Sequence, residues 1–184
     1  MNLLAMIVGE LVSLALLVML MRLLLQLVRA DFRNPICQAI VRLTNPLVIP
    51  LRRILPPIGK LDTATVVAVT IIVVILVAVG FAFAGFPGDG LIWIQQVVLT
   101  LCYTVLWIYF WAIIVYALLS LVAPGGYSPL QSVLASLCEP VLGPFRRIIP
   151  SFAGIDLSPL WACLAIQIIF YYLHYLPRPV FFGW

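Results

Sequence analysis

The chain has 184 residues, of which 65% are hydrophobic and only 9% are charged. Globular proteins are roughly 45–50% apolar and about 25% charged, so this composition excludes an ordinary water-soluble domain and predicts a protein that folds in a lipid bilayer. The net charge of +4 comes from a few groups in short loops between apolar stretches. We therefore expect anionic lipid headgroups, and not nucleic acid, as the counter-charge.

The first apolar stretch, residues 3–28, predicts a retained membrane span. As a helix it is about 39 Å long at roughly 1.5 Å per residue, enough to cross about 30 Å of hydrocarbon with tilt. It lacks the basic start and the cleavage site of a signal peptide. Arg22 lies near its end, from where the side chain can reach the headgroups. Glu10 lies deeper, and an intramembrane acid is by default a candidate functional residue.

A short amphipathic segment follows. Asn34-Pro35 predicts a helix N-cap followed by the first helical residue, and apolar residues then recur on one face over about ten residues. Ser128-Pro129 opens a segment of the same design in the second half of the chain. We expect both to lie in the plane of the membrane interface. The alternative is a short helix packed on the spans.

One stretch of the chain occurs twice, at an offset of 94 residues. Both copies contain three prolines and an arginine doublet, and both reach an aspartate at the same distance. The matching residues are Pro46, Pro50, Arg52, Arg53, Pro56 and Asp62 in the first copy, and Pro140, Pro144, Arg146, Arg147, Pro150 and Asp156 in the second. This pattern predicts a duplicated unit, with repeats over residues 1–90 and 91–184.

The repeated stretch suggests chemistry at the membrane surface. Its prolines are expected to prevent a long helix and to form a Pro/Arg-rich loop. The arginine doublets can hydrogen-bond to lipid phosphates or partner carboxylates, or they can serve only to set the topology. Asp62 and Asp156 precede apolar stretches and are candidates for helix caps. A sharper hypothesis pairs each of them with an arginine of the other copy.

Further spans are predicted at about 64–86, 100–122 and 159–176, although the third could also start at residue 91. The fold class is then an all-α membrane protein of about four transmembrane helices, arranged as two parallel two-helix repeats. Six Lys and Arg residues lie between the first two spans, and Arg146 and Arg147 lie between the last two. By the positive-inside rule both repeat loops are cytoplasmic and both termini are outside.

No catalytic constellation is recognisable. There is no Ser/His/Asp grouping and no Gly-rich phosphate loop, so we expect a protein that is not an enzyme. The four cysteines show no C-x-x-C spacing, and His174 is the only histidine. We therefore expect no metal site and no cofactor.

The doubled P-x-x-x-P-x-R-R-x-x-P, each copy followed by an aspartate, resembles the YggT family of bacterial integral membrane proteins, which is related to the YlmG proteins. With the flanking spans, the resemblance covers nearly the whole chain. It implies a multi-pass protein of the bacterial inner membrane. It also implies a membrane factor connected with osmotic or envelope stress or with cell division, without catalytic residues that could be assigned here.

Two functions remain in competition. The first is a scaffold or assembly factor whose arginines Arg52, Arg53, Arg146 and Arg147 bind anionic lipid and a partner, either another membrane protein or a second copy of the chain. The second is an oligomeric channel or transporter in osmotic adaptation, for which Glu10 is the main support in the sequence.

Overall fold

The computed structural model describes residues 3–56, 62–84, 89–122, 128–148, 156–173 and 175, and all regular structure within these ranges is helical. The all-α prediction is therefore confirmed. The six helices are α1 (Leu3–Leu27), α2 (Pro35–Arg52), α3 (Thr63–Ala84), α4 (Gly90–Val122), α5 (Pro129–Ile148) and α6 (Ser158–Leu173).

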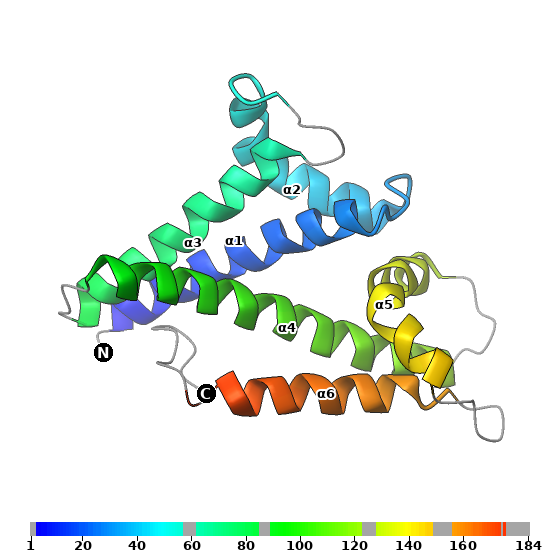
Figure 1. Cartoon of the computed structure of the whole chain (residues 1–184). Helices are drawn as coiled ribbons and strands as arrows, with labels where there is room; N and C mark the ends of the chain where they lie inside the picture. Colours follow the sequence, from blue (N-terminus) through cyan, green and yellow to red (C-terminus); the bar gives the residue numbers. More distant parts are fainter. Residues whose placement is uncertain are drawn as a thin grey trace.

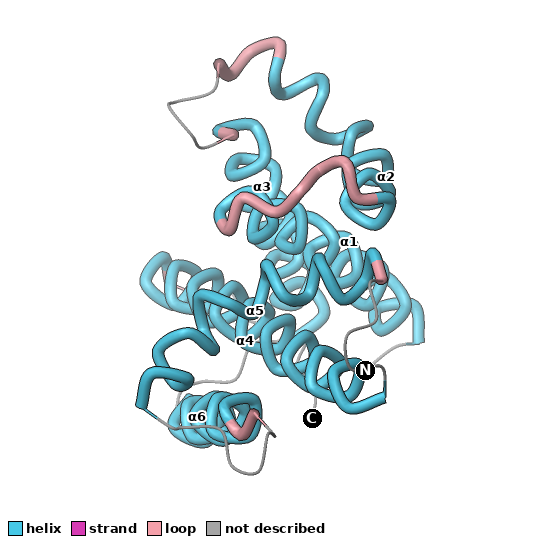
Figure 2. Tube along the Cα trace, turned by 90° about the vertical axis from the view of Figure 1, so that its right-hand side faces the viewer, coloured by secondary structure: helices cyan, strands magenta, loops and turns pink. Residues whose placement is uncertain are grey.

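Each half of the chain has the same order of elements: an apolar helix, an amphipathic helix and a second apolar helix. In the first half α1 packs along α3, and α2 contacts both of them. In the second half α4 packs along α6, and α5 contacts both (Figure 1). α2 also contacts α5 across the two halves, and Figure 2 shows α2 on the far side of the molecule from α6. Both halves thus pair their helices in the same way: the two apolar helices with each other, and the amphipathic helix with both.

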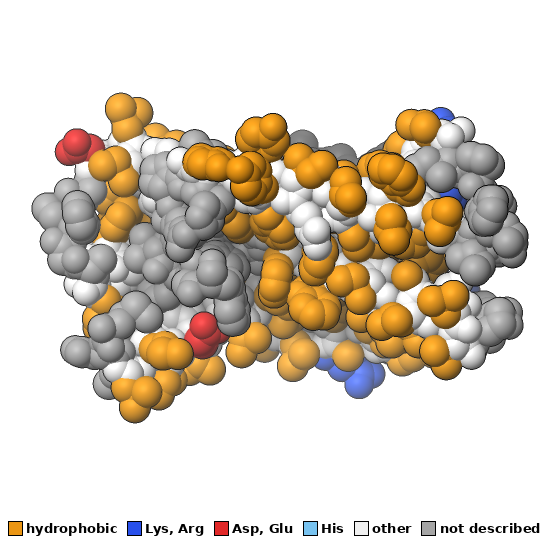
Figure 3. Space-filling model, turned by 90° about the horizontal axis from the view of Figure 1, so that it is seen from below, with side chains coloured by type: hydrophobic (Ala, Val, Ile, Leu, Met, Phe, Trp, Pro, Cys, Tyr) orange, Lys and Arg blue, Asp and Glu red, His pale blue; other side chains and the backbone are white. Residues whose placement is uncertain are grey.

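Three helices, α1, α3 and α4, are long and apolar enough to cross a membrane. The prediction of four such spans is not met in full, because α6 is apolar but has only 16 residues. At roughly 1.5 Å per residue it is about 24 Å long, shorter than the hydrocarbon core of about 30 Å. The third span is one continuous helix from Gly90, and not a surface piece followed by a helix. Hydrophobic side chains cover much of the described surface on the side of α6 (Figure 3).

The prolines do not break the amphipathic helices, so the predicted Pro/Arg-rich loop was wrong. Pro46 and Pro50 lie inside α2, and Pro140 and Pro144 lie inside α5. All four are exposed. A helical proline deprives the carbonyl four residues earlier of its partner, and in α2 these carbonyls belong to Arg42 and Pro46, both exposed. Water or headgroups can satisfy such carbonyls, so the cost of each proline is reduced.

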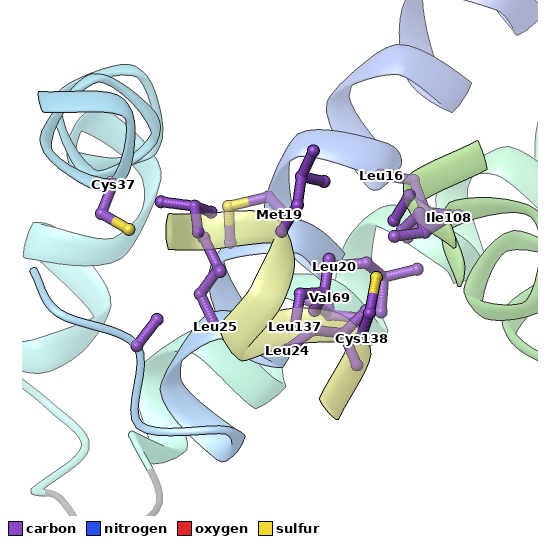
Figure 4. Packing of buried hydrophobic residues seen from close by; sticks show 14 of the residues in the cluster. Leu16, Met19, Leu20, Leu24, Leu25, Cys37, Val69, Ile108, Leu137 and Cys138 are labelled. Atoms are coloured by element: carbon purple, nitrogen blue, oxygen red, sulfur yellow. The ribbon is translucent and has the colours of Figure 1, made fainter. Parts of the chain in front are cut away.

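The core lies where the two halves meet. Leu16, Met19, Leu20 and Leu24 of α1 are buried against residues from several other helices. Figure 4 shows this side of α1 facing Val69, Ile108, Leu137 and Cys138, which come from α3, α4 and α5. α1 therefore joins the two halves, together with α3, which contacts α4, and α2, which contacts α5.

The predicted caps are confirmed. Asn34 Oδ1 accepts a hydrogen bond from the backbone N–H of Ile36 at 2.9 Å, and Ser128 Oγ accepts one from that of Gln131 at 3.1 Å. The Asn34 Nδ2 also donates to the carbonyl of Pro129 at 2.7 Å. The same residue thus begins α2 and joins it to the start of α5.

Candidate functional site

Arg22 is the most deeply buried charged side chain that the structure describes. It lies on α1 with 2% of its side chain exposed, so the expectation that it extends to the headgroups was wrong. Its Nη1 donates to Thr44 Oγ1 at 2.6 Å and to Asn45 Oδ1 at 3.1 Å, both on α2. α2 packs over this part of α1 and covers the guanidinium, which therefore binds α2 and not the lipid surface.

Asp62 links this buried arginine to an exposed one. Arg52 donates to Asp62 Oδ2 from Nη2 at 2.5 Å and from Nε at 3.2 Å. Arg22 Nη2 lies 4.0 Å from the same oxygen, and Thr65 Oγ1 donates to it at 2.6 Å. One carboxylate thus ties together α1, the end of α2 and the start of α3.

The second half repeats this arrangement with other residues. Arg146 Nε donates to Asp156 Oδ2 at 2.8 Å, as Arg52 does to Asp62. Its Nη1 donates to Glu139 Oε2 at 2.8 Å and its Nη2 to Tyr116 Oη at 3.2 Å. Tyr116 stands 94 positions after Arg22, and Glu139 stands 94 positions after Asn45. In this copy a phenol replaces the buried guanidinium.

The hypothesis that each aspartate pairs with an arginine of the other copy was wrong. Both ion pairs form within one copy, between residues ten positions apart. Each pair joins the end of an amphipathic helix to the start of the next helix. Thr63 Oγ1 also donates to the carbonyl of Pro56 at 2.7 Å, which is a second link of this kind in the first copy.

The aspartates have pKa values below their ordinary range. Burial acts to raise the pKa of Asp62, but hydrogen bonds from Arg52 and Thr65 and the charges of Arg52 and Arg22 outweigh it. Burial opposes the lowering of the Asp156 pKa as well, and hydrogen bonds from Ser158 and Arg146 outweigh it there. The capping role of Asp156 is direct, because its Oδ1 accepts from the backbone N–H of Ser158 at 2.9 Å.

The second arginine of each doublet is placed differently from the first. Arg53 and Arg147 are both exposed, and no ion pair within the described residues involves either of them. Each stands at or near the end of its amphipathic helix. Of the predicted motif residues, Pro56 follows the turn after α2, and Pro150 lies outside the described residues. The structure therefore divides each doublet into an arginine with an ion pair inside its own repeat and an exposed arginine with no ion pair among the described residues.

Glu10 lies on the outer surface of α1 and is not directed into the core. Ser13 Oγ donates to its backbone carbonyl at 2.9 Å and lies 3.4 Å from Oε2. The matching position of the second half is Thr104, which is buried and hydrogen-bonded to the carbonyl of Thr100. No group of three or more possible metal-ligating side chains occurs in the described part of the chain.

Sequence reasoning missed the residues that complete both sites. Thr44, Asn45 and Tyr116 are ordinary residues of apolar or amphipathic stretches, and nothing local marks them. The offset of 94 could have identified Asn45 and Tyr116, since it aligns them with Glu139 and Arg22 as polar positions of both copies, but it aligns Thr44 with Cys138. The contacts of Thr44 and Asn45 with Arg22, and of Tyr116 with Arg146, depend on how the helices pack.

Comparison with known proteins supports the doubled organisation. A family model described as CCB3/YggT matches residues 1–82 and 95–176, two segments that are again 94 positions apart at both ends. An uncharacterized protein of Pseudomonas aeruginosa is 46% identical over 162 residues, which cover 85% of this chain and 81% of that protein. The uncharacterized protein YggT of Escherichia coli is 35% identical over 92% of this chain and 88% of its own length. No solved structure matches the chain.

Proposed function

This chain belongs to the CCB3/YggT family, and on that premise we propose that it is a non-enzymatic scaffold or assembly factor of the bacterial inner membrane. In this proposal the exposed arginines of α2 and α5 bind anionic lipid headgroups and a membrane-protein partner on the cytoplasmic side. The role in the cell would be in the envelope or osmotic stress response or in cell division, as the family resemblance implies.

The observation that supports this proposal is the difference between the two arginines of each doublet. Arg52 and Arg146 are occupied by aspartates of their own repeat. Arg53 and Arg147 are exposed, one in each repeat, at equivalent positions. A guanidinium in such a place offers several donors in a planar arrangement that fits a phosphate. We therefore assign lipid or partner binding to Arg53 and Arg147, and a structural role to Arg52 and Arg146.

The exposed side of α2 fits the same role. Arg42 and Arg53 lie along one edge, and the neighbouring surface is apolar, with Leu43, Leu47 and Ile54 exposed. A helix with a basic edge beside an apolar surface suits the boundary between headgroups and acyl chains. The arginines would then meet lipid phosphates at this boundary.

The experiment compares thermal unfolding of the purified protein in zwitterionic detergent–lipid micelles with and without phosphatidylglycerol. We expect phosphatidylglycerol to raise the melting temperature of the wild type. The double variant Arg53→Gln/Arg147→Gln should lose most of this increment, while its melting temperature without phosphatidylglycerol (the baseline) should stay that of the wild type. Arg52→Gln is the matched control, since it should lower the baseline and keep the increment. A full increment in the Arg53→Gln/Arg147→Gln variant would refute lipid binding by these residues.

The ion-flux alternative depends on Glu10 and on several copies of the chain, because Glu10 lies on the outer face of α1. Potassium flux into vesicles that contain the purified protein tests it directly. Flux above that of empty vesicles, removed by Glu10→Gln, would replace the scaffold proposal.

A further inference from the structure

The amphipathic helices of the two repeats are not equally covered. Leu43 of α2 is 71% exposed, whereas Leu137, at the matching position of α5, is fully buried. The neighbouring positions on the same side of each helix show the same difference. Ala39 and Leu47 are exposed on α2, while their counterparts Val133 and Val141 are buried and partly buried on α5. We call Ala39, Leu43 and Leu47 the open stripe of α2.

A helix of the other repeat covers the corresponding stripe on α5. α5 contacts α1, and Leu137 belongs to the same buried cluster as Leu24 of α1, which is only 8% exposed. Figure 4 shows these two leucines beside each other. The α5 helix is therefore seated on the first helix of the preceding repeat.

The reverse contact is missing among the described residues. A symmetric pair of repeats would place α2 on α4 in the way that α5 is placed on α1, but α2 and α4 do not touch. The same holds for a second pair of helices, since α3 contacts α4 while α6 does not contact α1. The interface between the repeats is thus asymmetric. Its contacts of α1 with α4 and of α2 with α5 are unchanged when the repeats are exchanged, but the contacts of α5 with α1 and of α3 with α4 have no counterpart among the described residues.

Each of these unmatched contacts leaves its counterpart surfaces free, one half on each repeat, and a further unit can occupy these free halves. One free half is the open stripe of α2. The other lies on α4, where the position that matches Leu24 is Leu118, and Leu118 is 55% exposed. Both free surfaces are apolar. Their counterparts, on α5 and α1, already contact each other within the chain.

We propose that a second copy of this chain covers the open stripe, with α2 of one copy packed on α4 of the other and Leu43 beside Leu118. The intramolecular contact of Leu137 with α1 is the template for this intermolecular one. Membrane depth favours it, because Leu118 lies about as far from the end of α4 as Leu24 lies from the end of α1. Two copies with the same orientation in one bilayer present these surfaces at the same level.

Cysteine cross-linking in native membranes tests the contact. The background carries Cys102→Ala and Cys163→Ala, which removes the two cysteines that are not buried. Two differently tagged chains are co-expressed, one with Leu43→Cys and the other with Leu118→Cys, and are then oxidised. We expect a product that contains both tags, in at least a fivefold excess over the control pair. The control pairs Leu43→Cys with Leu160→Cys, because Leu160 is similarly exposed near the first turn of α6.

A second variant covers the case in which cysteine disturbs the fold. Leu43→Gln should reduce the fraction of the protein that migrates with the mass of more than one copy in detergent, while Leu160→Gln should not. Equal cross-linking of position 43 to positions 118 and 160 would overturn the proposal, because it would show that the chains meet by random encounter. A wild-type protein of single-copy mass without the cross-link would also overturn it and would show that lipid covers the stripe. Neither result depends on the response of Arg53 and Arg147 to phosphatidylglycerol.

Discussion

Replacing Asp62 by asparagine should cost far more stability than the same change at Asp156. Asn keeps the size of the side chain and much of its capping ability, so the two variants differ mainly in the charge that they leave behind. Asp62 is 12% exposed and serves Arg22, which is 2% exposed. Asp156 is 40% exposed, and its partner Arg146 is 32% exposed.

The expected magnitudes follow from these burials. Removal of one partner from a buried ion pair costs about 3–5 kcal/mol, because the remaining charge is left without compensation. Arg22 keeps its hydrogen bonds to Thr44 and Asn45, so we expect about 3 kcal/mol for Asp62→Asn, at the lower end of that range. Solvent screens the pair in the second repeat, so Asp156→Asn should cost about 1 kcal/mol or less.

Unfolding of the purified variants in mixed micelles of increasing dodecyl sulfate content, followed by tryptophan fluorescence, measures both losses. The double variant isolates the cause. Arg22→Tyr installs the residue that the second repeat has at Tyr116, and in that background Asp62→Asn should cost only about 1 kcal/mol, because no buried guanidinium remains. Equal losses for Asp62→Asn and Asp156→Asn, or an unchanged loss in the Arg22→Tyr background, would refute the reasoning.

Three other outcomes are expected. Arg29 lies two residues after the end of α1 and has a φ of 54°, a left-handed conformation that favours glycine. Arg29→Gly should therefore raise stability by about 1 kcal/mol in the same unfolding assay, and Arg29→Ala should not. The lowered pKa values of Asp62 and Asp156 give stability that is complete above their unfolded-state pKa of about 4 and is lost as the pH falls below it; thermal unfolding between pH 6 and 3 should show this loss, and Asp62→Asn should flatten it. Asn34→Ser keeps the N-cap and removes the hydrogen bond to Pro129, so it should lower the free energy of unfolding by about 1 kcal/mol. Asn34→Ala also removes the cap and should cost more; equal losses for the two variants would show that the cap is unimportant.

The features that could be read from the sequence are local or repetitive. The membrane class follows from composition, because hydrocarbon is the only solvent that such a chain tolerates. The caps at Asn34 and Ser128 follow from contacts within three residues, and the offset of 94 follows from comparing the chain with itself. The prediction that Pro46 and Pro50 prevent a long helix was wrong for a related reason. The general rule that proline breaks a helix does not consider whether the carbonyl that loses its hydrogen bond faces water.

Only the packed structure decided which partners the charges find. Arg22 looks like an arginine at the end of a span, and it became buried because α2 folds back over α1 and supplies Thr44 and Asn45. The aspartates pair within their own repeat because the end of each amphipathic helix lies beside the start of the following helix. The unequal burial of Leu43 and Leu137, in repeats that match in sequence, has no local cause either. It arises because α5 reaches α1 while α2 does not reach α4, and such contacts between distant segments are set by the assembly of the whole bundle.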